Sequence, residues 1–136
     1  MKKIVLVVTL VLSVFLVTGC SEGAGNEVDK IGFVTDTAGL GDLAFNDAVH
    51  EGVKQAAEDF GYELVVLESS EIADYENNIR SLINDGVDVV IVAANAMIDV
   101  VNRLAPEYPD TKFLTFDMEI PDIENVSATL FREQEA

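Results

Sequence analysis

Apolar residues along the chain alternate between short β-rich runs and stripes with helical spacing, which predicts an α/β fold. The connections between these segments are short, and parallel strands need crossover helices between them. The pattern therefore predicts a doubly wound, parallel, five-stranded sheet with helices on both faces. The expected strands cover residues 31–35, 64–67, 87–93, 112–116 and 126–130, and the expected helices cover residues 45–60, 72–83 and 98–105.

Glycine and proline residues mark the ends of the predicted helices. Gly61 follows the first helix, Gly86 follows the second, and Pro106 should stop the third. Asp42 lies just before the first helix, where a carboxylate accepts the free backbone N–H groups of the first turn. We therefore expect Asp42 to be the N-cap of that helix.

The amino-terminal segment has the pattern of an export signal. Lys2 and Lys3 precede a fourteen-residue run, 4–17, that is apolar except for Thr9 and Ser13. Such a run is short for a membrane span and typical of a secretory signal. An uncleaved anchor helix with an incidental cysteine is the alternative.

The four residues 17–20, Val-Thr-Gly-Cys, resemble a bacterial lipobox, in which the cysteine becomes an acylated first residue. We predict a signal peptide over 1–19, lipidation at Cys20, a flexible tether over 20–29 and a ligand-binding lobe over 30–136. The folded part would then be extracytoplasmic and anchored to the cell membrane by lipid. Because Cys20 is the only cysteine, a disulfide within the chain is excluded and a catalytic thiol is disfavoured.

Acidic residues dominate the charge of the chain. There are 25 Asp and Glu residues against 8 Lys and Arg residues, for a net charge of −17. Without Lys2 and Lys3, six basic residues remain against 25 acidic ones, a net of −19. Such a surface repels nucleic acid and anionic lipid head groups. We therefore expect no nucleic-acid partner, a membrane link through the lipid alone, and a monomer.

Ligands of doubly wound sheets bind beyond the carboxyl ends of the strands, where the strand order reverses. That rule points to three loops, which begin at Asp36, at Ala93 (with Asn95) and at Asp117. The first loop has neither the Gly-x-Gly-x-x-Gly fingerprint nor a P-loop lysine, so nucleotide phosphate binding is not indicated. Phe45 fits either a core position or a ligand contact, and Asn46 fits either a first-turn backbone contact or a ligand contact.

Three sequence elements resemble the basic membrane protein family. They are Thr35-Asp36-Thr37 followed by Asp42-x-x-Phe45-Asn46, the run Gly86-Val87-Asp88-Val89-Val90-Ile91, and Phe113-Leu114-Thr115-Phe116-Asp117. Members of this family are lipoproteins that bind purine nucleosides for ABC importers. The resemblance covers residue 30 to residue 136, and its most specific part is the Asp-x-x-Phe-Asn element.

The resemblance implies a type I periplasmic-binding-protein lobe that contacts a nucleoside through Asp36, Phe45, Asn46 and Asp117. It also implies ABC permease and ATPase subunits as partners and no cofactor. Members of the family hold the ligand between two lobes of similar size. Residues 131–136 have the pattern of a helix beginning, so we expect that a second lobe is absent from this sequence.

Some residues of the sequence also fit other functions. Asp36, Asp42 and Asp117 are candidates for a hard-metal site and magnesium-dependent phosphate chemistry. The single histidine, His50, is expected on the solvated face of a helix, and no Gly-x-Ser-x-Gly nucleophile elbow is present. We therefore predict that the protein is not an enzyme and holds no metal. A sugar- or autoinducer-binding lipoprotein of the same fold, or a sensory surface lipoprotein, are the alternatives.

Overall fold

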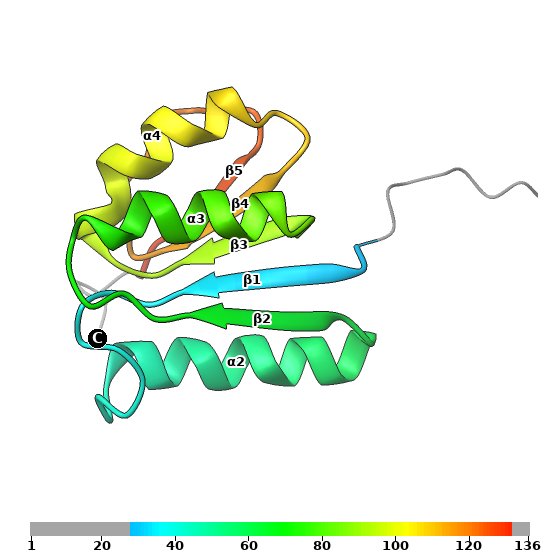
Figure 1. Ribbon diagram of the computed structural model, residues 1–136, viewed down its shortest axis with the longest axis vertical. Helices are drawn as coiled ribbons and strands as arrows, with labels where there is room; N and C mark the ends of the chain where they lie inside the picture. The colour runs from blue at the N-terminus through cyan, green and yellow to red at the C-terminus, as the bar shows by residue number, and fades with distance from the viewer. Residues whose placement is uncertain (1–27, 132–136) are drawn as a thin grey trace, which may run out of the picture.

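Five strands form one sheet at the centre of the molecule (Figure 1). The computed structural model describes residues 28–131, so the predicted signal peptide, Cys20 and nearly all of the tether lie outside it. No helix within this range is long and apolar enough to cross a membrane. The elements follow in the order β1 (Lys30–Val34), α2 (Phe45–Phe60), β2 (Glu63–Leu67), α3 (Asp74–Asn84), β3 (Val89–Val92), η2 (Asn95–Met97), α4 (Ile98–Glu107), β4 (Lys112–Phe116) and β5 (Val126–Thr129).

The strands lie in the order β2-β1-β3-β4-β5, and every neighbouring pair is parallel. The order reverses between β1 and β3, because β2 is added on one side of β1 and β3 on the other. The carboxyl ends of β1, β3 and β4 therefore meet at one edge of the sheet, beside this reversal. The predicted doubly wound, parallel, five-stranded sheet is confirmed.

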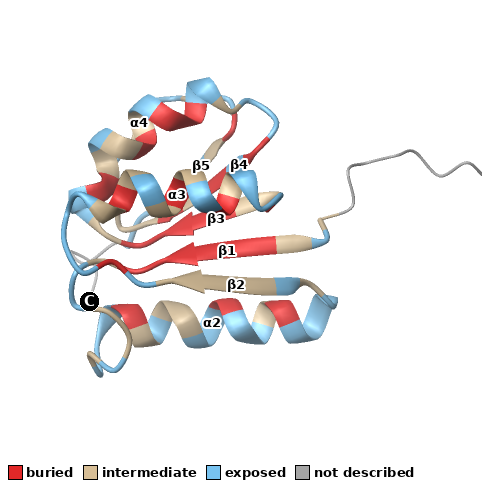
Figure 2. Cartoon of the chain, viewed as in Figure 1, coloured by how far each residue is buried: buried red, intermediate tan, exposed pale blue. Residues whose placement is uncertain are grey.

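Buried positions occur in the strands and in the helices that cover them (Figure 2), and the buried apolar residues form two layers, one on each face of the sheet. On one face Val34, Val90 and Phe113 pack with the apolar sides of α3 and α4. On the other face Phe33 and Ile91 pack with α2. Successive residues of a strand point to opposite faces of the sheet. Because both faces of the central strands are covered by apolar layers, these strands have apolar residues at nearly every position.

The first helix has the predicted bounds, but its amino-terminal cap differs from the prediction. Ala44 occupies the N-cap position and makes no side-chain cap bond. Asp42, two residues earlier, nevertheless accepts the backbone N–H groups of Ala44, Asn46 and Asp47 at 2.8, 3.1 and 3.2 Å. The predicted position was wrong, while the carboxylate does satisfy first-turn donors. Gly61 ends the helix with a left-handed φ of 76°.

The other two helices also depart from the prediction at their ends. Ile72 lies before α3 and is exposed, because α3 begins only at Asp74. Helix α4 continues through Pro106 to Glu107. A proline removes one backbone donor and is disruptive in a helix interior, whereas here only the last turn is affected.

One buried amide joins the end of α4 to the beginning of β5. The Asn125 side chain is 5% exposed, and its Nδ2 donates to the carbonyl oxygens of Ala105, Tyr108 and Thr111 at 2.9, 2.9 and 2.8 Å. These carbonyls belong to the last turn of α4 and to the connection that leads to β4. Asn125 therefore replaces the partners that a helix end lacks.

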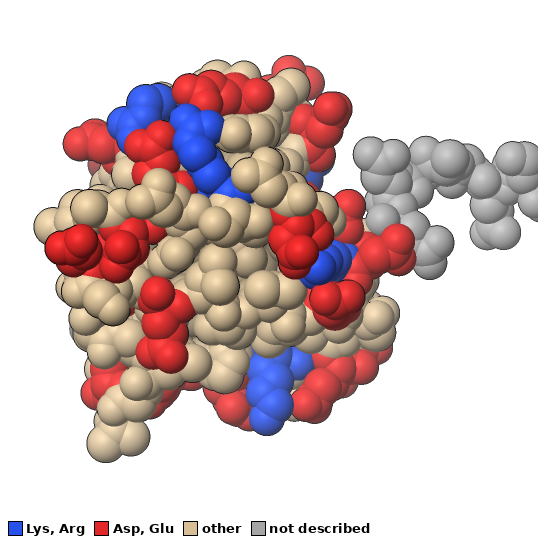
Figure 3. All heavy atoms as spheres, viewed as in Figure 1, with Lys and Arg blue, Asp and Glu red and all other residues tan. Residues whose placement is uncertain are grey.

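Three described basic side chains, Lys30, Arg80 and Arg103, are paired with acidic ones. Arg80 donates to Glu76 and Glu107 and to the hydroxyl of Tyr108, and Arg103 donates to Glu76. Hydrogen bonds from Arg80 and then Arg103 lower the pKa of Glu76. In Figure 3 the Lys and Arg side chains of the visible face lie beside Asp and Glu side chains. This face therefore presents no basic patch for an anionic partner.

Asn125→Ala is predicted to lower the free energy of unfolding by about 1–3 kcal/mol, because it removes a donor from three carbonyl groups, of which Ala105 and Tyr108 keep a backbone donor and Thr111 keeps none within residues 28–131. Urea denaturation of the variant measures the change. Asn77→Ala is the matched control, since Asn77 is exposed and its amide makes one long contact of 3.4 Å to Ala73. Equal effects of the two substitutions would contradict the role given to Asn125.

The stability contributed by Asp42 should depend on pH. Its pKa is lowered, first by the hydrogen bond from the N–H of Ala44. A lowered pKa in the folded state means that the carboxylate stabilises the fold above its ordinary pKa of about 3.9, and that this contribution is lost as the pH falls below that value. Asp42→Ala should therefore lower Tm at neutral pH, and the difference from the parent chain should shrink as the pH falls below about 4. A Tm difference that is constant with pH would argue against this account.

Candidate ligand-binding site

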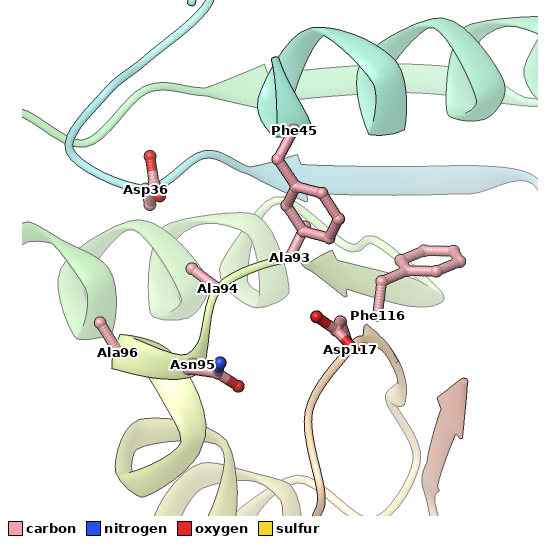
Figure 4. A pocket seen from close by; sticks show the side chains of 8 residues that line it. All are labelled: Asp36, Phe45, Ala93, Ala94, Asn95, Ala96, Phe116 and Asp117. Atoms are coloured by element: carbon pink, nitrogen blue, oxygen red, sulfur yellow. The ribbon is translucent and has the colours of Figure 1, made fainter. Parts of the chain in front are cut away.

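A cavity of about 260 Å³ lies at the carboxyl edge of the sheet, where the strand order reverses (Figure 4). The loop after β1, the start of α2, the loop after β3 and the end of β4 all contribute to it. In Figure 4, Asp117 and Asn95 lie across the cavity from Asp36. The cavity is lined by Asp36, Phe45, Ala93, Ala94, Asn95, Ala96, Phe116 and Asp117.

Three of the four residues predicted to bind ligand line the cavity, and the fourth lies behind it. Asn46 is 1% exposed, and its Nδ2 donates to Asp36 Oδ1 at 2.7 Å and to Asp42 Oδ2 at 3.2 Å. Its Oδ1 accepts the backbone N–H of Asp36 at 3.2 Å. Both N–H groups and the oxygen of this amide are thus used within the described part of the chain. Asn46 positions Asp36 for the cavity.

Hydrogen bonds within the described chain engage one oxygen of the Asp36 carboxylate. Oδ1 accepts from Asn46 and from the backbone N–H of Ala38 at 2.8 Å, while Oδ2 has no donor among residues 28–131. Thr35, directly before it, is fully buried and accepts the N–H of Ser69 at 3.3 Å. The end of β1 is therefore fixed, while one carboxylate oxygen of Asp36 accepts no hydrogen bond within residues 28–131.

The rest of the first loop is held by carboxylates from other elements. Glu68, after β2, accepts the N–H of Leu40 at 2.8 Å. Asp47, in the first turn of α2, accepts the N–H groups of Gly41 and Leu43 at 2.7 and 2.9 Å. Loop N–H groups that would otherwise depend on water are bonded to charged acceptors, which form strong hydrogen bonds.

Gly39 is required by this arrangement of the loop. Its φ is 69°, a left-handed conformation that costs other residues energy. A Cβ at this position would also lie 2.8 Å from Glu68 Oε2. The left-handed backbone is therefore the main reason for glycine at this position, and a side chain there would also displace the end of the Glu68 side chain.

Asp117 reaches the cavity because the chain turns sharply after β4. Its φ is 54°, which aspartate tolerates better than most residues. Its backbone N–H donates to the carbonyl of Thr129 on β5 at 2.7 Å, so the turn is tied to the sheet. Met118 then points into the core and is fully buried. The side chain of Asp117 lines the cavity beside Phe116.

Phe45 is a wall of the cavity and does not belong to either buried core layer. It is 38% exposed, although it is the first residue of α2 and the helical pattern also fitted a core position. In Figure 4 its ring projects from the start of the helix toward the strand ends. The interior face of the helix begins instead with Asn46, a polar residue that the apolar pattern does not mark.

Asn95 is a cavity residue that was not among the four predicted. The sequence pointed to its loop as a ligand position, because the loop follows a buried strand, but gave no reason to select the amide. Asn95 begins the short helix η2, is exposed, and makes no side-chain hydrogen bond within residues 28–131. Its neighbours Ala94 and Ala96 have small side chains, which leave room at the mouth of the cavity.

Of the three carboxylates considered for a metal site, Asp36 and Asp117 line the cavity and Asp42 does not. Asp42 is engaged with backbone N–H groups, and no group of three His, Cys, Asp or Glu side chains within residues 28–131 is arranged to hold a metal ion. His50, expected on a solvated face, is half-buried and stacks on Phe33 with 6.3 Å between ring centroids. That expectation was wrong, because this side of α2 faces the sheet.

The cavity combines acceptors, one amide and an aromatic wall. Two carboxylates accept hydrogen bonds from N–H or O–H donors, Asn95 both donates and accepts, and Phe45 and Phe116 offer ring faces and edges. No Lys or Arg side chain from the described residues, 28–131, lines the cavity. These features suit an uncharged, planar ligand that carries several donors, and they disfavour a phosphate group.

Comparison with known proteins agrees with this architecture. Residues 29–136 match the family model of Bmp, described as "ABC transporter substrate-binding protein PnrA-like". Basic membrane protein A of Borreliella burgdorferi is 31% identical over 138 residues, which cover 99% of this chain and 40% of that protein. The ABC transporter nucleoside-binding protein BmpA of Lactococcus lactis is 26% identical, with 100% of this chain and 42% of that protein covered.

A solved structure gives the same result for the fold. The solute-binding protein of an ABC transporter system from Aeropyrum pernix superposes with a TM-score of 0.72 at 29% identity, over 79% of this chain and 30% of that one. The chain thus spans about two fifths of the length of the two curated relatives above. Since the family model covers most of its residues, this chain belongs to the Bmp family of PnrA-like ABC transporter substrate-binding proteins.

Proposed function

We propose that this chain is the amino-terminal lobe of an ABC importer's substrate-binding lipoprotein, and that its cavity holds one side of a purine nucleoside. The observation that carries the proposal is that Phe45 and two carboxylates, Asp36 and Asp117, line one cavity at the strand-order reversal. A purine has a flat π-face and N–H donors, and ribose adds hydroxyl donors, without any obligatory charge. The name of the Lactococcus lactis relative, a nucleoside-binding protein, supports the same ligand class.

Each residue has a distinct role in this proposal. Phe45 stacks on the base, a contact worth about 1–3 kcal/mol. Asp36 and Asp117 accept hydrogen bonds worth about 1.5–3 kcal/mol each, since both acceptors are charged. Asn46 acts through Asp36, whose carboxylate and backbone it holds.

One lobe supplies too little binding energy for tight capture. The contacts above amount to about 4–9 kcal/mol, against an association cost of about 4–15 kcal/mol. The cavity of about 260 Å³ is also below the usual ligand-pocket range of about 300–1,000 Å³. In the proposed parent protein a second lobe closes over the ligand and supplies the missing contacts. The same proposal places the protein outside the cytoplasm, held to the membrane by lipid on Cys20 and working with a permease and an ATPase.

Titration with inosine, guanosine, adenosine and ribose, followed by amide chemical shifts, tests the ligand assignment on this chain. We predict millimolar or weaker binding of the purine nucleosides, with shifts at Asp36, Phe45 and Asp117 and smaller ones with ribose. Phe45→Ala should remove the response, because the stacking contact is lost. Phe60→Ala should leave it unchanged, since Phe60 is an exposed aromatic at the far end of the same helix.

Two results would argue against the proposal. Ribose or another sugar that shifts these amides as strongly as inosine would favour the sugar-binding alternative. A submicromolar dissociation constant for this chain alone would show that a second lobe is not needed for capture.

A further inference from the structure

The side chains that line the ligand cavity are rich in hydrogen-bond acceptors and poor in donors. Asp36 and Asp117 contribute two carboxylates, and an ionised carboxylate accepts hydrogen bonds but donates none. The other lining side chains are alanine and phenylalanine, except for Asn95, which carries the one side-chain nitrogen in Figure 4. Among residues 28–131, Asn95 is therefore the one cavity-lining side chain that can donate a hydrogen bond.

The amide of Asn95 is not used by the fold. Asn95 is exposed, and its side chain makes no hydrogen bond within residues 28–131. The buried amides of Asn46 and Asn125, in contrast, donate to groups of the chain itself. An exposed asparagine is ordinarily only solvated, so the position of Asn95 decides what its amide can do.

The backbone on both sides of Asn95 is anchored in the core. Ala93, directly after β3, is 2% exposed and belongs to the apolar layer that packs with α2. Met97 is fully buried in the layer that packs with α3 and α4, and its N–H donates to the carbonyl of Ala94 at 2.8 Å. Asn95 thus projects from a fixed turn. A donor that is placed before the ligand arrives loses less conformational freedom on binding.

The strand order gives a ligand a preferred orientation. Strand β3 lies between β1 and β4, so the loop that carries Asn95 begins between the segments that carry Asp36 and Asp117. A ligand atom that only accepts hydrogen bonds is repelled by carboxylate oxygens. Within the described chain its side-chain partner is Asn95. The donors of the ligand should therefore face the carboxylates, and an acceptor should face Asn95.

We propose that Asn95 donates a hydrogen bond to a ring nitrogen of the purine base, an assignment that rests on the function proposed above. Ribose hydroxyls both donate and accept, so the carboxylates can satisfy them. The ring nitrogens N3 and N7 of a purine only accept, and a buried acceptor without a donor weakens binding. Asparagine is a common partner of N7 in the recognition of adenine. Asn95 would then select ligands by a base acceptor, and Phe45 by the ring face.

Nucleosides that lack one ring nitrogen test this assignment on the isotope-labelled chain. Whichever of adenosine and inosine binds more tightly is compared with its 7-deaza and 3-deaza analogues, in which a C–H group replaces the acceptor. Dissociation constants come from the amide shifts. In the parent chain we expect one analogue to bind about fivefold more weakly than the nucleoside. In Asn95→Ala, binding of the nucleoside should fall by about the same factor, and binding of that analogue should be unchanged.

A second substitution and a matched control separate loss of the donor from loss of the fold. Asn95→Asp keeps the size of the side chain but replaces the donor by a third carboxylate, so it should weaken nucleoside binding at least as much as Asn95→Ala. Neither substitution should lower Tm, because the amide is exposed and unbonded within residues 28–131. Asn77→Ala, at an exposed asparagine of α3 outside the cavity, should leave every affinity unchanged.

Two results would overturn the assignment while leaving the proposed function intact. One is that both analogues bind the parent chain as tightly as the nucleoside. The other is that Asn95→Ala weakens the nucleoside and both analogues by the same factor, or weakens none of them. If neither adenosine nor inosine shifts the amides of Asp36, Phe45 and Asp117, the proposed function fails, and this assignment fails with it.

Discussion

The side-chain amide of Asn46 links the end of β1 to the beginning of α2 by hydrogen bonds, which we call the Asn46 joint. The geometry of the candidate ligand cavity depends on these bonds. The amide holds the carboxylate and the backbone of Asp36, and it also contacts Asp42, which binds the first turn of the helix. Asp36 comes from the strand and Phe45 from the helix, so their relative position is set by how these two elements meet. A buried amide with all its groups satisfied fixes that position more specifically than apolar packing alone.

The acidic character of the chain has a structural use at this edge of the sheet. Asp36, Asp42, Asp47 and Glu68 together accept nine hydrogen bonds from backbone and side-chain donors of the first loop and helix. Each carboxylate offers two oxygens to N–H groups that a loop of this shape cannot pair with a neighbouring strand. A loop ordered before the ligand arrives loses less conformational freedom on binding.

The fold was predictable from sequence because each buried strand leaves a continuous apolar run and each helix a periodic stripe. Strand β4 was predicted with its observed bounds, and Gly61 correctly marked the end of α2. The helix starts were less predictable, since they depend on partners distant in sequence. The acceptor role of Asp42 could be read from its position, whereas the first residue of the helix could not.

The site was predictable in part, because the positions of the predicted strands also indicate which residues follow their carboxyl ends. Asp36 and Asp117 directly follow predicted strands, so the topology alone brings them to one edge. Asn46 and Asn95 are both asparagines near that edge, and only the structure shows that the first faces inward and the second faces the cavity. Likewise, His50 is half-buried because of how α2 is rotated about its axis on the sheet. The presence of a single histidine in the sequence does not indicate that rotation.

Amide hydrogen exchange of the first loop, measured by NMR without ligand, tests most directly whether carboxylates and the Asn46 joint hold the site in place. The account predicts that the N–H groups of Ala38, Leu40, Gly41, Leu43 and Ala44 are protected, although most of these residues lie at the surface. It also predicts that Asn46→Ala removes this protection while leaving that of β3 and β4 intact. Exchange of these loop amides at the rate of an unstructured chain, in the parent protein, would contradict it.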